Sequence, residues 1–212
     1  MSSGARPLDR GVVARVAERG RVRSFAPGQH LYARGEPGES LMVVRDGWAE
    51  VGIVGASGRP SILGRVQAGD LVGDLACLDG GPRSADVIAR SDLTASVIAR
   101  RDMLDLLRTD PEVMLAVVTS LCAKVRNASD MLELQTLPGA RARLAGATLR
   151  LLDETGGDGI ALSQGWLGAF AGLTRENVNR QIRAFTEVGA LEFRDGTLRV
   201  LDRTILEDAA EG

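Results

Sequence analysis

The stretch that decides the fold is residues 72–87, which read VGDLACLDGGPRSADV. Gly73 allows a ligand to approach the backbone closely, because it has no Cβ. Residues 74–78 can form one short helical turn, whose free N–H groups favour an anion. Arg83 offers a planar fork of donors that suits a phosphate, and Ser84 adds a hydroxyl group. These residue types together predict a site for an anionic phosphate group.

Asp74 adds an acceptor to this set of donors. Its carboxylate lies next to the glycine in the sequence and can accept hydrogen bonds from the hydroxyl groups of a ribose. Charge, donors and acceptor together predict a sugar-phosphate site. An Asp–Arg pair in a loop is also typical of a solvated surface salt bridge, and the residues alone leave both interpretations open.

The distribution of glycine around this stretch separates two kinds of structure. Residues 28–81 contain 12 glycines in 54 positions, whereas residues 82–138 contain none in 57. Dense glycine between short apolar runs is typical of tight turns between the strands of a sandwich or barrel. The Asp46-Gly47 pair predicts a hairpin between the third and fourth strands. The expected strands are residues 22–25, 30–33, 41–44, 48–54, 62–66, 85–89 and 93–98.

The glycine-free stretch predicts a long helix. Asp110 and Pro111 suit its cap and first position, and the helix should end near Thr136, before Pro138. Its apolar residues recur at alternating steps of four and three, which is the a/d seam of a coiled coil. The seam favours a parallel homodimer, and a helix packed on its own domain is the alternative. The seam positions are Met114, Val118, Leu121, Val125, Ala128, Leu132 and the polar Gln135.

Two shorter helices are expected after the long one. Ser163 can cap the first, Gly172 can end it, and Thr174 can cap the second. Two short helices joined by a glycine turn describe a helix-turn-helix, and arginine and glutamate side chains can read guanine and cytosine in the major groove. A solvated polar helix face is the alternative. The second helix buries Val178, Ile182 and Phe185, and its other face presents Arg175, Glu176, Asn179, Arg180 and Arg183.

The overall composition gives no sign of general nucleic-acid affinity. The 212 residues include 26 basic and 28 acidic side chains, a net charge of −2, whereas a nucleic-acid binder usually has a basic surface. Residues 174–183 nevertheless carry three arginines against one glutamate. No apolar run has the length of a membrane helix, and no signal-peptide core follows Met1, so a cytoplasmic protein without a membrane partner is expected.

The residues of redox and metal chemistry are few. Cys77 and Cys122 are too few for a disulfide scaffold or a four-thiolate iron–sulfur cluster, and their apolar neighbours predict two small buried side chains. His30 is the only histidine and is expected to be a partly exposed strand residue. Near Arg83 the sequence offers no base, nucleophile or metal-binding constellation, so we expect no enzyme activity, and a nucleotide-processing enzyme is only a third alternative.

The first motif resembles a known family. Gly73-Asp74-Leu75-Ala76 and the later Pro82-Arg83-Ser84-Ala85 are similar to the phosphate-binding cassette of cyclic-nucleotide-binding domains. The resemblance implies that Arg83 and Ser84 hold the cyclic phosphate and that Asp74 replaces the family's glutamate on the ribose 2′-hydroxyl. Aspartate is one methylene shorter and has less reach. In cyclic-AMP receptor proteins a Thr-Ser pair on the long helix contacts the purine, and Ala128 and Ser129 take these positions here.

The second motif resembles the winged helix-turn-helix of Crp/Fnr-type transcription regulators. Leu-Ser-Gln at 162–164 and Leu-Thr-Arg-Glu-Asn-Val-Asn-Arg at 173–180 carry the likeness, and residues 193–200 match the wing hairpin. Gly165-Trp166 departs from the family pattern, and we expect changed packing there. The resemblance implies base reading by Arg175, Glu176 and Arg180. The DNA-binding set that it implies also contains Ser163, Gln164, Thr174 and Asn179.

Both motifs follow the family's domain order over residues 15–205. They imply an α+β fold with an N-terminal cyclic-nucleotide-binding β-roll (jelly-roll-like, 1–110), a dimerisation helix (111–137) and a C-terminal winged helix-turn-helix (138–212). The expected function is that of a homodimeric transcription regulator on near-palindromic double-stranded DNA, with RNA polymerase as a further partner. The expected effector is cyclic AMP or, second, cyclic GMP, with no metal, haem or iron–sulfur cofactor. The alternative is a regulator with a degenerate pocket that acts without cyclic nucleotide or with another effector.

Overall fold

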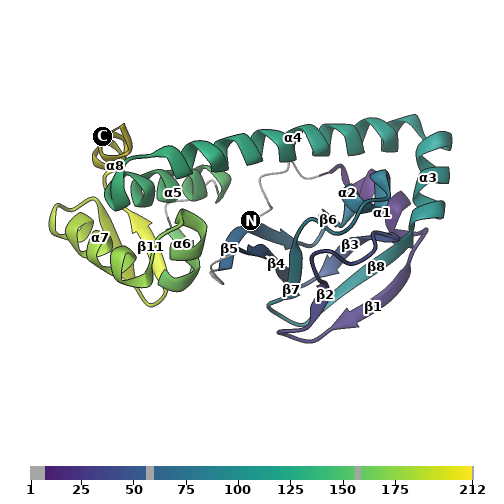
Figure 1. Cartoon of the computed structure of the whole chain (residues 1–212), viewed down its shortest axis with the longest axis horizontal. Coiled ribbons are helices and arrows are strands. Elements are labelled where there is room, and N and C mark those ends of the chain that lie inside the picture. Colours follow the sequence, from purple (N-terminus) through teal and green to yellow (C-terminus); the bar gives the residue numbers. More distant parts are fainter. Residues whose placement is uncertain (1–7, 56–59, 156–158, 212) are drawn as a thin grey trace. The chain divides into compact units, whose positions relative to one another are not determined.

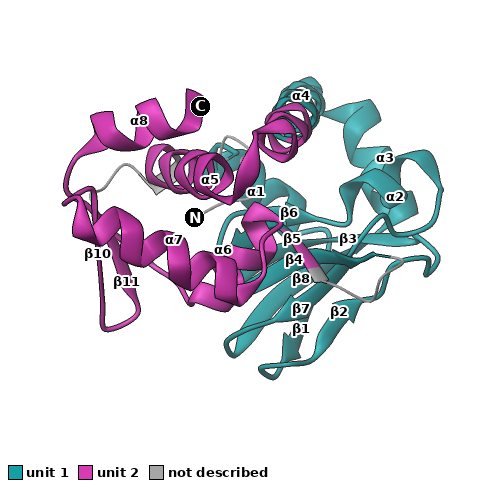
Figure 2. Cartoon of the chain, turned by 60° about the vertical axis from the view of Figure 1, so that its left-hand side comes forward, with its two compact units in different colours: residues 1–58, 63–127 teal, residues 59–62, 128–212 magenta. Residues whose placement is uncertain are grey.

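The computed structural model describes residues 8–55, 60–155 and 159–211, which belong to two compact units (Figure 1, Figure 2). The first unit comprises residues 1–58 and 63–127, and the second comprises residues 59–62 and 128–212. Helix α4 (Pro111–Thr136) contributes to both units, because the boundary falls within it.

The first unit is built on two four-stranded antiparallel sheets. One sheet has the order β1 (Arg21–Phe25), β8 (Leu93–Ala99), β3 (Ser40–Asp46), β6 (Leu71–Val72). The other has the order β2 (His30–Tyr32), β7 (Asp86–Ala89), β4 (Trp48–Val54), β5 (Pro60–Gln67). Buried side chains from both sheets form one core, including Phe25, Leu31, Met42, Val87 and Leu93. The expected β-roll is therefore confirmed.

Helices cover the outer face of the first sheet. These are α1 (Arg10–Ala17), α3 (Arg100–Thr109) and the first turns of α4. Strand β3 is buried on both faces because its alternate residues point in opposite directions: Leu41 and Val43 contact the helices, whereas Met42 and Val44 contact the other sheet. This explains why the strand reads as a continuous apolar run rather than an alternating one.

The predicted hairpin at Asp46-Gly47 is wrong. Strand β3 lies in one sheet and β4 in the other, so the chain changes sheets at Gly47. Both edges of β3 are already taken, because it pairs with β8 on one side and with β6 on the other. Gly47 has φ of +78°, and a Cβ there would lie 2.1 Å from the carbonyl oxygen of Asp92. Gly47 therefore allows two loops to pass close to each other, and it is not part of a two-residue hairpin.

Helix α4 begins at the predicted cap and has two apolar faces. The carboxylate of Asp110 accepts a hydrogen bond from the backbone N–H of Val113 at 3.1 Å. Val113 and Val117 are buried in the core of the first unit. Most seam residues are exposed instead of buried in this core. Val125 is 67% and Leu132 70% exposed, and Met114 and Val118 are exposed to a lesser degree. Leu121 is partly buried. The seam is thus not the face with which α4 covers its own core.

The described part of the second unit contains a three-stranded sheet and four helices besides α4. Its sheet has the order β10 (Leu191–Arg194), β11 (Thr197–Val200), β9 (Gly159–Ala161). Helix α5 (Gly139–Thr155) contacts α6 (Gln164–Ala171), α7 (Arg175–Glu187) and α8 (Arg203–Glu211). Helix α8 was absent from our sequence prediction. The Asp202 carboxylate caps it by accepting from the Thr204 N–H at 2.9 Å, and Arg203 binds Asp153 at 2.7 Å.

The expectations for cysteine and histidine are met in part. Cys77 is buried and His30 is an exposed residue of β2, as predicted. The prediction that Cys122 is buried is wrong, because it lies on the exposed side of α4, next to the partly buried seam residue Leu121. Within the described ranges, no helix combines the length and apolarity needed to cross a membrane.

The turn between α6 and α7 generates the first prediction. A Cβ on Gly168 would lie 2.9 Å from the carbonyl oxygen of Leu173 and 3.2 Å from a methyl of Val178. Gly168→Ala should therefore lower the free energy of unfolding by about 1–3 kcal/mol, as overpacking does. Gly165→Ala in the same helix is the matched control, because its Cβ would meet only the Ser163 hydroxyl at 3.9 Å.

The control variant should keep or slightly raise stability, since alanine is the better helix former. Urea unfolding followed by far-UV circular dichroism measures both variants. Equal unfolding midpoints for the two would contradict the close packing of the helix-turn-helix.

Candidate functional site

The cassette places a glycine where Arg83 passes closest to the backbone. Short helix α2 (Asp74–Asp79) follows β6, and Gly73 caps it with φ of +79°. A Cβ on Gly73 would lie 2.4 Å from Nη1 of Arg83 and 3.2 Å from the Tyr32 ring. Any other residue would thus suffer an unfavourable φ and displace the arginine. The group that lies closest to Gly73 in the structure is Arg83, and the predicted approach of a ligand to this glycine stays a prediction.

Arg83 is held inside the first unit, only 5% exposed. Its Nη1 donates to the carbonyl oxygens of Ser40 at 2.7 Å and Gly73 at 2.9 Å, and its Nη2 donates to the Ser40 hydroxyl at 3.2 Å. The guanidinium carbon lies 4.3 Å from the centre of the Tyr32 ring. The Nε atom is buried and has no hydrogen-bond partner among the described atoms. A buried donor without a partner costs free energy, and an incoming anion would supply the missing acceptor.

Tyr32 stays neutral beneath the guanidinium. Burial raises the pKa of Tyr32 above its ordinary value, which outweighs the opposite effect of the nearby Arg83 charge. The ring therefore presents an uncharged aromatic face to the cation, as a cation–π contact requires. Ser40 and Tyr32 together fix the direction of the arginine fork.

Asp74 does not pair with Arg83. Both of its carboxylate oxygens lie 2.7 Å from Nζ of Lys124, which comes from α4, and the Asp74 side chain is only 4% exposed. Lys124 also donates to the carbonyl oxygen of Leu71 at 3.4 Å. The interpretation of an Asp–Arg surface salt bridge is therefore wrong: the two charges of the cassette are buried and have separate partners.

The other predicted nucleotide-binding residues differ in exposure. Ala76 is buried, and a Cβ on Gly38 would lie 2.3 Å from its methyl group, so the loop before β3 packs directly on α2. Leu75 and Ser84 are exposed. Ala128 and Ser129 are exposed residues of α4 and belong to the second unit, so their predicted contact with the purine stays a prediction.

Sequence reasoning missed three residues of this site, namely Tyr32, Ser40 and Lys124. Each lies more than 40 residues from its partner in the chain, so no local motif links them. One signal was present in composition: Lys124 is the chain's single lysine among 26 basic residues.

The second candidate surface lies on α6 and α7. The Ser163 hydroxyl accepts from the Trp166 N–H at 3.1 Å, and the Thr174 hydroxyl accepts from the Asn177 N–H at 3.3 Å, so both predicted caps are present. Val178, Ile182 and Phe185 are buried. The outer face of α7 is hollowed into a groove of about 550 Å³. Its lining residues are Glu176, Asn179, Arg180, Arg183, Ala184 and Glu187.

The remaining parts of this surface also form as expected. Arg175, Glu176 and Arg180 are exposed and Asn179 is half-buried, while Gln164 begins α6. Trp166 is buried and stacks on Phe170 with ring centres 5.2 Å apart, and the predicted change of packing relative to the family stays a prediction. The wing is a hairpin of β10 and β11.

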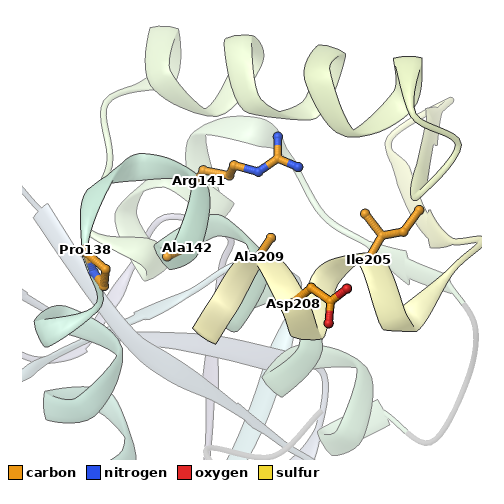
Figure 3. Close-up of a pocket in the computed structure, with 6 residues that line it drawn as sticks. All are labelled: Pro138, Arg141, Ala142, Ile205, Asp208 and Ala209. Carbon is orange, nitrogen blue, oxygen red and sulfur yellow. The ribbon is translucent and has the colours of Figure 1, made fainter. Parts of the chain in front are cut away.

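The second unit has another cavity, which shares no lining residue with the one on α7. This cavity, of about 490 Å³, lies between α5 and α8 and is lined by Pro138, Arg141, Ala142, Ile205, Asp208 and Ala209 (Figure 3). Arg141 is held there by the Phe185 ring, 4.6 Å from its guanidinium carbon. The described residues contain no group of three or more His, Cys, Asp or Glu side chains that could hold a metal ion.

Comparison with known proteins finds a family model for each of the two regions that contain these surfaces. The family model of the cyclic nucleotide-binding domain matches residues 22–110, and that of the Crp-like helix-turn-helix domain matches residues 142–209. A protein of Thermus thermophilus named cyclic AMP receptor protein is 31% identical over 190 residues, which are 90% of this chain and 88% of that protein.

Solved structures show the same fold. The crystal structure of the catabolite activator protein of Thermus thermophilus is 30% identical, with a TM-score of 0.55 over 97% of this chain and 96% of that one. The regulator CLP of Xanthomonas campestris, described as c-di-GMP responsive, has a TM-score of 0.79 at 17% identity, covering 92% of this chain and 100% of that one. With both domains in this order and a relative of this similarity, the chain belongs to the CRP/FNR family of transcription regulators.

Proposed function

We propose that the protein is a homodimeric, sequence-specific DNA-binding regulator controlled by a cyclic nucleotide, cyclic AMP in the first place. The observation that carries the effector is Arg83, a buried guanidinium with a donor that has no partner among the described atoms. Ser84, exposed beside it, supplies a hydroxyl to the same phosphate, and Asp74 is the acceptor for the ribose. The name of the Thermus thermophilus relative supports cyclic AMP.

A second candidate is a regulator on the same fold with a different effector or none. It is favoured by Asp74, which is shorter than the family's glutamate and whose carboxylate is already taken by Lys124. The c-di-GMP responsive regulator from Xanthomonas campestris shows that this fold accompanies other effectors. Ala128, which lacks the hydroxyl of the family's purine contact, points in the same direction.

The DNA-binding part of the proposal rests on helix α7. In a parallel dimer through the α4 seam, two copies of α7 would enter successive major grooves about 34 Å apart on a near-palindromic site. Arg175, Glu176 and Arg180 would read bases, with Ser163, Gln164, Thr174 and Asn179 completing the contact. We also propose that residues 1–110, 111–137 and 138–212 act as effector, dimerisation and DNA-binding regions, in the cytoplasm and together with RNA polymerase.

Arg83→Ala should abolish nucleotide binding, because it removes the donors to the phosphate. Isothermal calorimetry with cyclic AMP and cyclic GMP measures this on the full chain. Arg90→Ala is the control, since Arg90 is exposed and pairs with Glu50 at 2.7 Å, outside the cassette. Heat from Arg83→Ala equal to that of the control would contradict the cassette, and no heat from the wild type with either nucleotide would favour the second candidate.

Arg180→Ala should relax base preference at one operator position by about 1–3 kcal/mol, the usual worth of a bidentate base contact. Operator selection from a random library, followed by fluorescence anisotropy on single-base variants, measures the change. A uniform loss of affinity across all sequences would assign Arg180 to the phosphate backbone instead.

Val125→Glu should convert the dimer to monomers, because it places a charge in the apolar seam. Light scattering measures the mass of the variant. Thr119→Glu is the matched control, since Thr119 is exposed on the same helix but lies outside the seam. A dimer that survives Val125→Glu would show that the copies meet elsewhere.

A further inference from the structure

The cavity between α5 and α8 has a composition that no sequence motif pointed to. Its volume of about 490 Å³ lies within the range of about 300–1,000 Å³ that is common for small-molecule sites. It belongs to the second unit alone and shares no residue with the cassette or with the groove on α7. The lining combines one cation, one anion and four apolar residues, namely Arg141, Asp208, Pro138, Ala142, Ile205 and Ala209.

Two chain segments build the walls with the same spacing. Residues at positions i, i+3 and i+4 lie on one face of a helix. Residues 138, 141 and 142 have this spacing at the start of α5, and residues 205, 208 and 209 have it on α8, across the cavity (Figure 3). Helix α8 is fixed on α5, because Leu206 is fully buried and Arg203 binds Asp153 at 2.7 Å. The two walls are therefore held together by packing and by an ion pair outside the cavity.

Arg141 is the cation of the cavity, and an aromatic ring holds it. Its guanidinium carbon lies 4.6 Å from the ring centre of Phe185, a buried residue of α7. Within the described ranges, the guanidinium forms no ion pair and no hydrogen bond. A guanidinium that rests on a ring still directs its N–H donors outward in its own plane, where they suit a carboxylate.

Asp208 is the anion, and it too lacks an internal counter-ion. Its neighbour Glu207 binds Arg203 at 2.7 Å. Among the residues that the structure describes, the carboxylate of Asp208 pairs with no basic side chain, Arg141 included. A ligand with a single charge is attracted by one of these two groups and repelled by the other, whereas a zwitterion is attracted by both.

We propose that this cavity is a binding site for a small apolar α-amino acid. The ligand's carboxylate accepts hydrogen bonds from Arg141, its ammonium group donates to Asp208, and its side chain contacts Ile205 and Ala142. Hydrogen bonds between charged groups are the strong ones, and the apolar lining adds the burial of a hydrocarbon side chain. The site is additional to the proposed nucleotide site and does not depend on it.

A ligand held at both charges connects α5 with α8, because each helix supplies one of the partners. Such a ligand binds the folded second unit and not the unfolded chain. It should therefore raise the unfolding midpoint of this unit by an amount that grows with ligand concentration.

Three related compounds test the class of ligand on the full chain. L-Leucine carries both charges, 4-methylpentanoate lacks the ammonium group, and 3-methylbutylamine lacks the carboxylate. Titrations followed by ligand-detected NMR should give an affinity for L-leucine roughly fivefold or more above that for either analogue, the effect of one partly exposed charge contact. Equal affinities for the three compounds, or no binding of L-leucine at millimolar concentration, would overturn the proposal.

Two variants assign each charge of the ligand to its partner. Arg141→Met should weaken L-leucine and 4-methylpentanoate roughly fivefold and leave 3-methylbutylamine unchanged. Asp208→Asn should weaken L-leucine and 3-methylbutylamine by the same factor and leave 4-methylpentanoate unchanged. This crossed pattern separates a lost contact from a fold defect, which would weaken all three compounds alike and would count against the assignment.

Matched controls remove the same charges outside the cavity. Arg199→Met changes an exposed arginine of β11, and Glu211→Gln changes an exposed carboxylate at the end of α8. Both should bind L-leucine as the wild type does. A loss in the controls equal to that in Arg141→Met and Asp208→Asn would show a general effect of net charge and overturn the site.

A last comparison separates this site from the proposed nucleotide site. Arg83→Ala should bind L-leucine as the wild type does, because Arg83 lies in the first unit. Loss of L-leucine binding in Arg83→Ala would place the amino acid in the cassette and refute the cavity. Nucleotide titrations of Arg141→Met and Asp208→Asn should match the wild type, so either proposal can fail while the other stands.

Discussion

The buried ion pair between Asp74 and Lys124 is the interaction on which the arrangement of the first unit depends. It joins the cassette to α4 through a carboxylate that is 4% exposed. Removing either partner would leave the other charge without its counter-ion, which is costly in the protein interior. Arg83 lies in the same interior but is satisfied by carbonyl groups and an aromatic face. The two charges of one short motif therefore have different partners: the guanidinium contacts carbonyl groups and a ring, and the carboxylate contacts an ammonium group from α4.

Helix α4 provides the lysine of this pair and continues into the second unit. One face buries Val113 and Val117 in the core, and another exposes the regular apolar seam that we assign to a second copy. A helix of 26 residues is about 39 Å long. The chain carries a cyclic nucleotide-binding domain and a Crp-like helix-turn-helix domain, and α4 is the element that both units share.

Local patterns in the sequence predicted most of the fold, because they depend on neighbouring residues. The caps at Asp110, Ser163 and Thr174 and the heptad steps of α4 are of this kind. The hairpin at Asp46-Gly47 failed because both edges of β3 pair with strands distant in the sequence. Tyr32, Ser40 and Lys124 escaped notice for the same reason, since only the folded chain brings them to the cassette. Helix α8 had a readable cap at Asp202, which lay beyond the last recognised motif.

Amide hydrogen exchange of the full chain, with and without cyclic AMP, tests the central claim most directly. The account predicts slower exchange in the cassette, at residues 73–84, together with a change in α4 around residues 120–127. It predicts both effects in the same titration, because the cassette and the helix share one ion pair. Protection confined to the cassette, with α4 unchanged at saturating nucleotide, would contradict the coupling of effector site and helix.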